Sequence, residues 1–245
     1  MSDLTKFIVV AEVASNHGGD MRLAKRYAVG ARWAGCDEVK YQYYRAEELM
    51  PENDPRFEKV KAAQLSLEQL GVLKAHCENI GIGFLCTPFK TIERVEELAS
   101  LGLHEVKIRE ADSQDVVMTR RAIDLFDRVF ISTTKLPTDM FLLYHPHIKW
   151  LYTVPKYPAK PEEVDLSAFK VFDGFSCHVP NIAVPLAATA VALVSEREEF
   201  WVEVHVTLSH NENNLDKEVS LDFSELSRLV GYLRTIEKMK HREIY

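Results

Sequence analysis

The feature that most restricts the fold of this chain is a repeated alternation of short apolar runs and helix-type segments. Eight apolar, β-rich runs occur along the 245 residues, and each is followed by a segment with helical spacing or capping signals. Neighbouring parallel strands need a crossover connection, usually a helix. Eight such units in a chain of roughly 250 residues are typical of an α/β protein with a closed (β/α)8 TIM barrel. Because no linker or low-complexity tract interrupts the units, we expect one domain over residues 1–245.

The strands and helices can be placed from apolar runs, turn residues and caps. We expect strands at Phe7–Val10, Glu38–Tyr44, Gly81–Thr87, Glu105–Glu110, Arg128–Thr133, Ile148–Val154, Phe172–Cys177 and Phe200–Leu208. We expect helices at Met21–Ala34, Ser66–Asn79, Ile92–Ser100, Asp115–Phe126, Thr138–Tyr144, Glu162–Phe169, Ile182–Val194 and Phe223–Lys240. The polar stretch Arg45–Phe57 contains two prolines and is predicted to be a long active-site loop.

Composition excludes several classes of protein. Hydrophobic residues make up 47% and charged residues 27% of the chain, which is typical of an ordinary soluble globular protein. The net charge of -7 argues against nucleic acid or an anionic membrane as a partner, although it allows a small anionic substrate. The four cysteines form no CxxC pair, which favours free thiols in a reducing compartment. Because no signal peptide or membrane-spanning run is recognisable, we expect a cytoplasmic protein.

Polar residues gather at the expected carboxyl ends of the strands, where a TIM barrel carries its active site. This ring contains Glu12, Asn16, His17, Lys40, Gln42, Thr87, Lys107, Arg109, Glu110, Asp112, Ser132, Thr133, Tyr157, Ser176, His178 and His205. Two histidines on neighbouring strands, His178 and His205, together with carboxylates suit a divalent metal ion. Lysines and hydroxyl groups suit a phosphate or a carboxylate.

The same residues also have purely structural interpretations. A strand-end histidine is often only a hydrogen-bonding group, and Thr87 could simply end a strand before Pro88. Lys40 and Lys107 could be ion-pair partners of Glu12 and Glu110 inside the barrel, since buried charges need partners whatever their function. Cys177 is interpreted as an inert buried thiol, because adjacent His178 is its one evident activator. The pattern therefore predicts a metal- and anion-binding barrel enzyme without specifying its reaction.

Longer motifs make the interpretation more specific. In chain order these are AEVASNHGGD at Ala11, VKYQ at Val39, FLCTPF at Phe84, KI at Lys107, ISTT at Ile131, KYP at Lys156, GFSCH at Gly174, EVHVTL at Glu203, and DKEVS at Asp216. With these motifs in this order over nearly its whole length, the chain resembles the catalytic barrel of the sialic acid synthase (N-acetylneuraminate synthase) family.

The resemblance implies an activity and a role for most of the ring. The family condenses phosphoenolpyruvate with an open-chain amino sugar such as N-acetylmannosamine, giving a 2-keto sugar acid and phosphate. A divalent metal ion, Mn or Mg, would be held by His178 and His205 and would polarise the sugar aldehyde. The residues that would bind phosphoenolpyruvate are Lys40, Thr87, Lys107, Arg109, Ser132 and Ser176. The residues that would take part in catalysis or orient sugar, metal or water are Glu12, Gln42, Lys107, Asp112, Tyr157 and Asp216.

The chain departs from the family pattern at several positions. Glu110 stands where a phosphate-binding serine is usual, so that Arg109 is expected either to pair with Glu110 or to take over the phosphate. Pro155 replaces an asparagine donor and Cys177 an aspartate. We also expect the chain to lack the antifreeze-like C-terminal domain, which in the family supplies an arginine to the partner subunit and much of the dimer contact, so the formation of a homo-oligomer stays open.

Two other hypotheses are a metal-dependent barrel lyase, aldolase or isomerase that does not use phosphoenolpyruvate, and a non-catalytic ligand-binding homologue.

Overall fold

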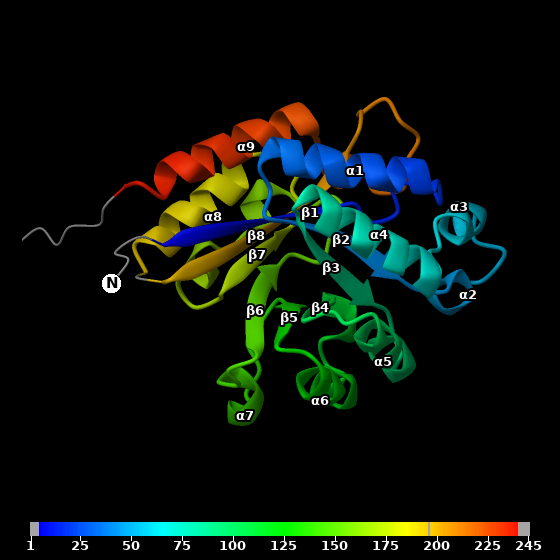
Figure 1. Cartoon of the computed structure of the whole chain (residues 1–245). Coiled ribbons are helices and arrows are strands. Elements are labelled where there is room, and N and C mark those ends of the chain that lie inside the picture. The colour runs from blue at the N-terminus through cyan, green and yellow to red at the C-terminus, as the bar shows by residue number, and fades with distance from the viewer. Residues whose placement is uncertain (1–4, 196, 240–245) are drawn as a thin grey trace, which may run out of the picture.

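Eight parallel strands surround the centre of the molecule in this computed structural model, which describes residues 5–195 and 197–239 (Figure 1). The strands are β1 (Lys6–Glu12), β2 (Glu38–Tyr43), β3 (Gly83–Pro88), β4 (Glu105–Ile108), β5 (Arg128–Thr133), β6 (Ile148–Thr153), β7 (Gly174–Cys177) and β8 (Glu199–Thr207). Their order is β3-β2-β1-β8-β7-β6-β5-β4, so the first and last strands pair. No ladder joins β3 to β4 within the described ranges, although the two strands are neighbours. The predicted TIM barrel is confirmed, and it is nearly closed.

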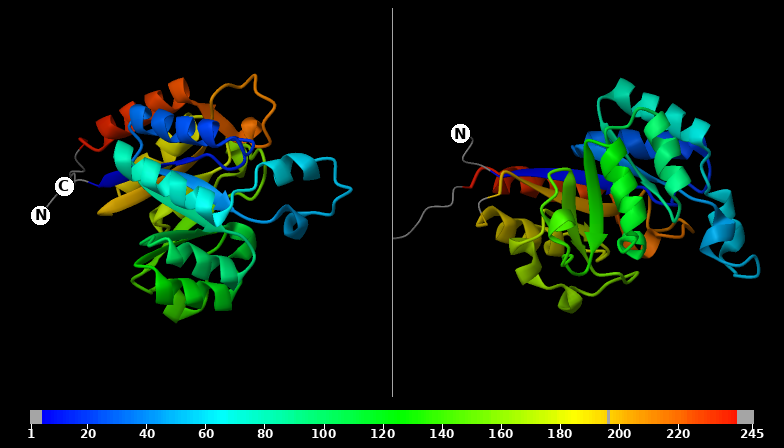
Figure 2. Two further views of the ribbon diagram at one scale, coloured as in Figure 1. Left: turned by 45° about the vertical axis from the view of Figure 1, so that its right-hand side comes forward. Right: turned by 90° about the horizontal axis from the view of Figure 1, so that it is seen from below.

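Helices alternate with the strands and cover the outside of the barrel (Figures 1 and 2). They are α1 (Met21–Ala34), α2 (Ala46–Leu49), α3 (Phe57–Ala62), α4 (Leu67–Ile80), α5 (Ile92–Ser100), α6 (Val116–Leu125), α7 (Met140–Leu143), α8 (Ala183–Leu193) and α9 (Phe223–Ile236). Within the part of the chain that the structure describes, no helix is long and apolar enough to cross a membrane.

Strand alternation sorts each strand into an outer and an inner face. On β1 the side chains of Phe7 and Val9 belong to the large core under the helices, whereas Ile8 and Val10 belong to a smaller cluster inside the barrel. That inner cluster also contains Leu85, Phe130, Leu151 and Trp201. It fills the lower part of the barrel with apolar side chains. Inward positions nearer the carboxyl ends carry polar residues instead, which is how the fold places Glu12 above Val10.

Gly174 shows how tightly the barrel wall is packed. It begins β7, and a Cβ atom at this position would lie 2.4 Å from Leu151 Cδ2 and 2.5 Å from the carbonyl oxygen of Trp201. Real Cβ atoms do not approach other heavy atoms so closely, and closely packed interiors cannot easily make room. The absence of a side chain here therefore lets β7 pair closely with its neighbours β6 and β8.

Several expected boundaries were wrong. The stretch Arg45–Phe57 is not one open loop, because it contains α2 and leads into α3, which pack on a small core of Tyr44, Phe57, Val60 and Phe89. The expected strand at Glu105–Glu110 ends at Ile108, and a 3-10 turn follows at Glu110–Asp112. The expected helix at Glu162–Phe169 is replaced by two 3-10 segments, Pro161–Glu163 and Leu166–Lys170.

The C-terminal part contains one strand that the sequence pattern does not predict. β9 (Ser220–Asp222) pairs in parallel with the end of β8, with His205 opposite Ser220. It is only three residues long and lies directly before α9, so it left no alternating pattern to recognise. The predicted end of the last helix, Lys240, lies outside the described residues; within them α9 ends at Ile236.

Candidate active site

A cavity of about 360 Å³ opens at the carboxyl ends of the barrel strands. Every residue to which the resemblance gives a role lines it except Asp112, whereas Asn16, His17 and Thr133 of the predicted ring do not. The predicted residues that it brings together are Glu12, Lys40, Gln42, Thr87, Lys107, Arg109, Ser132, Tyr157, Ser176, His178, His205 and Asp216. Glu110 and Pro155, the two departures on this face, also line it, and so does Glu203, for which the sequence analysis gave no role.

Glu203 is the centre of a buried charge cluster. Its Oε2 lies 2.9 Å from Lys40 Nζ and 3.1 Å from Lys107 Nζ, and its Oε1 accepts a 2.5 Å hydrogen bond from Ser176 Oγ. Lys40 Nζ also lies 2.7 Å from Glu12 Oε2. The structural interpretation of Lys40 as a partner of Glu12 is thus confirmed, whereas that of Lys107 as a partner of Glu110 is wrong. Two buried ammonium groups share two buried carboxylates, as buried charges require.

Burial and neighbouring charges shift the pKa values of this cluster in opposite directions. Burial lowers the pKa of Lys40 to about 8 and also lowers the pKa of Lys107. Burial alone would raise the pKa of Glu203, but the ammonium groups of Lys107 and Lys40 lower it below its ordinary value. Glu203 is therefore ionised at neutral pH, and the sequence carried a signal for it. An acid inside the apolar run of β8, two residues before His205, must point inward with that histidine.

His178 and His205 lie side by side above this cluster, with ring centroids 5.5 Å apart. His178 Nδ1 is 2.9 Å from the carbonyl oxygen of Val154, so we assign the ring proton to Nδ1, which leaves Nε2 free as a ligand. His205 Nδ1 is buried and has no hydrogen-bond partner among the described residues. Burial lowers the pKa of His178 to about 4 and that of His205 well below its ordinary value. Both rings are therefore neutral at pH 7, the form that binds a metal ion.

Two hydroxyl groups on the cavity wall are also unpaired. Thr87 Oγ1 and Ser132 Oγ are buried, and neither has a hydrogen-bond partner in residues 5–195 and 197–239. Buried polar groups in native proteins are nearly always hydrogen-bonded, if not to protein then to water or ligand. Both side chains therefore have donors available for a bound molecule.

Arg109 is engaged by Asp112 and not by Glu110. Its Nε and Nη2 atoms lie 2.6 Å and 3.2 Å from the two carboxylate oxygens of Asp112, and its guanidinium lies over the ring of Phe89. The expected alternative of an Arg109–Glu110 pair is wrong. Asp112 does not line the cavity. The 3-10 turn Glu110–Asp112 after β4 brings its carboxylate back to Arg109, three residues earlier, so that Asp112 orients the guanidinium. Glu110 lines the cavity and makes no ion pair with any described residue.

The loop after β1 orders Asp216 at the mouth. Asn16 donates from Nδ2 to the carbonyl oxygen of Val206 and accepts from the backbone N–H of Asp216 at 3.1 Å. The backbone N–H of Ser15 donates to Asp216 Oδ2 at 3.1 Å. His17 does not reach the cavity, because its Nδ1 accepts from the N–H of Gly19 within the same turn. Asn16 and the Ser15 backbone thus help to place Asp216, whose carboxyl has a pKa raised by burial, whereas His17 only supports its own turn.

Comparison with known proteins assigns this architecture to a family. A family model described as NeuB matches residues 28–245, which is most of the chain. The chain belongs to the NeuB family. The predicted resemblance is therefore confirmed.

Two of the relatives and one solved structure are sugar acid synthases by name. N,N'-diacetyllegionaminic acid synthase from Campylobacter jejuni is 27% identical over 266 residues, which cover 96% of this chain and 78% of that protein. Human N-acetylneuraminate-9-phosphate synthase is 26% identical over 264 residues, covering 94% and 70%. The crystal structure of a sialic acid synthetase from Leptospira borgpetersenii, in complex with citrate, superposes with a TM-score of 0.85 at 27% identity, covering 96% of this chain and 85% of that one.

Pro155 and Cys177, two of the departures expected from the sequence, offer the cavity no polar side chain. Pro155 lines the wall but has neither a backbone N–H nor a polar side chain to offer a ligand. Cys177 points away from the cavity into the outer core, and burial raises the pKa of its thiol to about 12. Its Sγ donates to the carbonyl oxygen of Val179. Cys177 is thus an inert thiol, as interpreted from the sequence.

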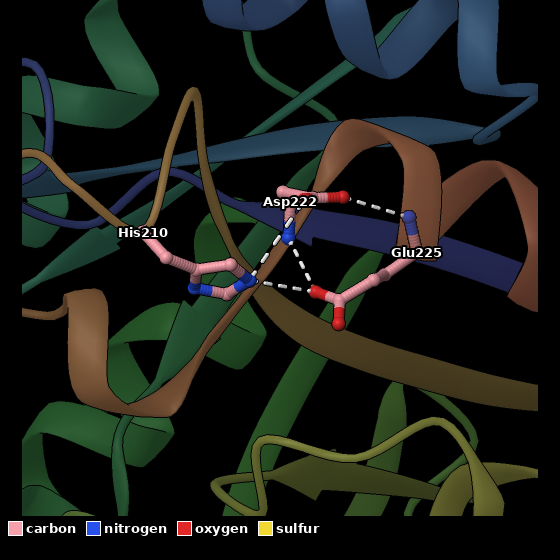
Figure 3. A group of neighbouring side chains, drawn as sticks. All are labelled: His210, Asp222 and Glu225. Carbon is pink, nitrogen blue, oxygen red and sulfur yellow. Dashed lines mark hydrogen bonds and ion pairs between the residues drawn. The ribbon is translucent and has the colours of Figure 1, made fainter.

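A second group of possible metal ligands lies at the start of α9. Ligand atoms of His210, Asp222 and Glu225 lie within 4.8 Å of one another (Figure 3). Asp222 and Glu225 form the capping box of this helix, each accepting the other's backbone N–H, and His210 Nε2 lies 2.9 Å from Glu225 Oε2. The helix cap explains this group without a metal ion.

Proposed function

We propose that this NeuB-family chain condenses phosphoenolpyruvate with an aldose, an amino sugar resembling N-acetylmannosamine, to give a 2-keto sugar acid and phosphate with the help of a divalent metal ion. The observation that carries the proposal is the Lys40–Glu203–Lys107 cluster, which faces the same cavity as two neutral histidines. In the reaction, carbon 3 of phosphoenolpyruvate forms a bond to the aldehyde carbon. Water adds at carbon 2, and the bond from carbon 2 to the phosphate oxygen breaks.

The residues that would hold phosphoenolpyruvate lie at or just after the carboxyl ends of β2, β3, β4, β5 and β7. The ammonium groups of Lys40 and Lys107 attract its anionic groups, and the unpaired hydroxyls of Thr87 and Ser132 supply fixed donors. Ser176 can turn its hydroxyl from Glu203 toward the ligand. Because two carboxylates already neutralise the two lysines, these residues alone provide little net positive charge for a phosphate.

That charge balance supports a role for a metal ion, Mn or Mg. His178 and His205 would hold it, and the unpaired Nδ1 of His205 and the free Nε2 of His178 fit that role. No third histidine, cysteine or carboxylate in the described residues completes a ligand group with them, so water or substrate oxygens would fill the remaining positions. When bound, the ion supplies Lewis-acid polarisation of the aldehyde oxygen.

Proton transfer and orientation would fall to Glu12, Gln42, Tyr157 and Asp216, which line the same cavity. Glu12 Oε1 accepts a hydrogen bond from Gln42 Nε2, and its other oxygen is paired with Lys40, so this pair is fixed for orienting the sugar. Asp216 has a raised pKa caused by burial and makes no ion pair with a described residue, so it is the better acceptor for the proton of the attacking water. Tyr157 packs on His178 with ring centroids 4.1 Å apart and would hold that ring in place.

Phosphate release tests the proposal. The purified chain is incubated with Mn²⁺, phosphoenolpyruvate and a panel of aldoses, and free phosphate is measured. We expect release that requires both metal and aldose and that is lost in Lys107→Met. Lys149→Met is a matched control, because Lys149 is the second residue of β6 and lies at the other end of the barrel. No release with any aldose under these conditions would refute the proposal.

A metal-dependent lyase, aldolase or isomerase that does not use phosphoenolpyruvate is a second candidate, and Glu110 favours it. An ionised carboxylate on the cavity wall repels a phosphate group. Thermal-shift measurements separate the candidates, because a ligand that binds the native state raises its stability. Stabilisation by both metal and phosphoenolpyruvate supports the synthase, and stabilisation by metal alone supports the second candidate. Stabilisation by neither supports a non-catalytic homologue.

A further inference from the structure

A second cavity, of about 510 Å³, lies on the outside of the barrel between α1 and α9, which pack side by side (Figure 1). His76 of α4 and Leu208, the residue after β8, complete its wall. We call it the α1–α9 pocket. None of its lining residues lines the active-site cavity. Its volume is within the range of small-molecule sites, about 300–1,000 Å³.

The floor of the α1–α9 pocket is apolar, and a glycine fixes its shape. Gly30 lies within α1, and a Cβ atom at this position would lie 2.7 Å from the ring of Phe223. The ring of Phe223, the first residue of α9, therefore packs directly on the backbone of α1. Glycine destabilises a helix interior relative to alanine, and here its small size allows this close contact. Val29 and Leu208 extend the floor, which offers an apolar surface to a ligand.

The rim of the pocket combines an exposed aromatic side chain with two cations. Lys25, Arg26, Val29 and Trp33 recur along one face of α1, at the spacing of successive helix turns. Trp33 is 87% exposed, which alone would be ordinary, but here the indole borders an apolar floor. No carboxylate lines the pocket, and neither Lys25 nor Arg26 forms an ion pair with a residue in 5–195 or 197–239. Two such cations attract an anion locally, although the chain as a whole has a net charge of -7.

The wall of the pocket is connected to the active site. Leu208 and Phe223 flank the segment from β8 to α9, which carries Asp216. The backbone N–H of Leu208 donates to Tyr27 Oη at 3.2 Å, and Tyr27 Oη donates to the carbonyl oxygen of Asn16 at 3.4 Å. The side chain of Asn16 in turn accepts from the N–H of Asp216. A ligand that packs on both ends of this segment would therefore stabilise it.

We propose that the α1–α9 pocket binds a small organic anion that has an apolar ring system, and that this ligand stabilises the segment that carries Asp216. The ring would lie on Phe223 and beside Trp33, because aromatic contact and the removal of apolar surface from water both favour binding. Lys25 and Arg26 would hold the anionic group through charge-assisted hydrogen bonds. A carboxylate and a phosphate ester share this chemistry, and the experiment distinguishes them. The inference goes beyond the proposed function and does not depend on it.

Trp33 reports on binding directly. The chain has three tryptophans, and Trp150 and Trp201 are both buried elsewhere in the barrel. Heteronuclear NMR of isotope-labelled protein resolves the three indole N–H signals, and Trp33→Phe assigns one of them to Trp33. The probes are naphthoate and adenosine monophosphate, titrated separately. Their controls are the neutral ring compounds naphthamide and adenosine, and the ring-free anions acetate and inorganic phosphate.

We expect naphthoate, adenosine monophosphate or both to shift the Trp33 signal saturably, while the signals of Trp150 and Trp201 stay in place. The affinity should exceed that of the matching neutral and ring-free controls by about tenfold or more. The probe that binds more tightly identifies the anionic group. No saturable shift with either probe, or equal affinity for its neutral counterpart, would overturn the inference.

Two paired variants test the cations. Lys25→Gln combined with Arg26→Gln should weaken binding at Trp33 by about tenfold or more. Arg120→Gln combined with Lys170→Gln is the matched control, because both side chains are exposed on other elements and the net charge changes equally. Melting curves show whether each variant folds, and the comparison of probes in the wild-type chain needs neither variant. An equal loss in both paired variants would show attraction by the overall charge alone and would overturn the role of Lys25 and Arg26.

Hydrogen exchange tests the link to the active site. With the pocket saturated by the tighter probe, the backbone amides of Leu208 and Asp216 should exchange more slowly, because a ligand of the native state opposes local opening. The same probe should cause no slowing in Lys25→Gln with Arg26→Gln, which distinguishes the pocket from binding in the active-site cavity. Unchanged exchange in the wild-type chain would overturn the effect on Asp216. No turnover is measured, so this result is separate from the test of the proposed function.

Discussion

Replacing Glu203 by glutamine tests the most connected part of the site. The change keeps the size of the side chain and removes the one carboxylate that both lysines share. Lys40 keeps Glu12 at 2.7 Å, but Lys107 is left with Ser176 Oγ at 3.4 Å. An almost fully buried ammonium group then lacks a counter-charge. Glu203→Gln is therefore expected to destabilise the fold mainly through Lys107.

The magnitude follows from the cost of breaking a buried ion pair from one side, about 3–5 kcal/mol. Removing the stranded charge as well, in Glu203→Gln with Lys107→Met, should recover about 2–3 kcal/mol of this loss, because the two sites are coupled. The pair Lys40–Glu12 remains balanced in the double variant. Glu203→Gln and Lys107→Met should each release no phosphate, whereas the double variant should recover stability but not activity. Stability and phosphate release therefore report on different aspects of the cluster.

The pH dependence has a definite sign. Burial lowers the pKa of Lys40 in the folded state to about 8, below the ordinary value of 10.5. Between these two values the unfolded state binds more protons than the folded state, so this lysine makes stability rise with pH, and its full cost is present below pH 8. Without Glu203 the pKa of Lys107 in the folded state falls further. The pH range over which the folded state binds fewer protons than the unfolded state then extends to lower pH. The stability lost in Glu203→Gln should therefore shrink as pH rises from 7 to 9.

Urea denaturation followed by circular dichroism measures these differences. Glu218→Gln is the control, because its side chain is 73% exposed and surface changes usually stay within about 0.5 kcal/mol. Burial raises the pKa of buried thiols and phenols such as Cys86 and Tyr44, so these groups make stability fall as pH rises into the alkaline range. Each variant is therefore compared with the wild-type chain at the same pH. A loss below about 1 kcal/mol in Glu203→Gln, or strictly additive effects in the double variant, would refute a buried charge cluster.

Three further predictions concern other parts of the barrel. Glu110→Ser removes a carboxylate from the cavity wall and should tighten phosphoenolpyruvate binding about tenfold in calorimetry; unchanged affinity would show that Glu110 does not face the phosphate. Burial raises the pKa of Glu38 well above 4.5, so the folded state holds a proton that the unfolded state has lost, and stability falls as pH rises above 4.5. Glu38→Gln should remove this fall in melting curves between pH 4.5 and 8, and parallel curves would contradict it. Gly174→Ala should cost about 1–3 kcal/mol in urea denaturation because its methyl group meets Leu151, while Gly231→Ala, with open space in α9, should be neutral or stabilising.

Much of the fold could be predicted because the physical signals are local. Buried parallel strands read as apolar runs, and the period of two along each strand decides which side chains point inward. This is why the sequence alone assigns Glu12, Lys40 and His205, each in or directly after such a run, to one cavity. These residues lie on the neighbouring strands β1, β2 and β8 of the nearly closed barrel.

The remaining features depend on contacts between distant segments. Whether Arg109 pairs with Glu110 or with Asp112 is decided by a single 3-10 turn after β4, a choice of a few backbone angles that residue types do not determine. The shared position of Glu203 between two lysines needs the register of β8 against its neighbours. β9 is shorter than the shortest recognisable alternation, and its pairing with β8 is visible only in three dimensions.

The pairing of β9 with β8 fixes the end of β8 that carries His205 and leaves the excursion between the two strands freer to change in sequence. Beyond residue 204, where its pairing with β7 ends, the edge of β8 is taken up by β9, so His205 lies within a hydrogen-bonded ladder on both sides. The excursion between the two strands, which carries Leu215 and Asp216, is thereby fastened at its two ends. Sequence changes in this excursion can therefore alter the cavity wall near Asp216 without moving the histidines. Under the proposed function, such a division would let the preferred acceptor sugar change while the residues of the bond-forming centre stay in place.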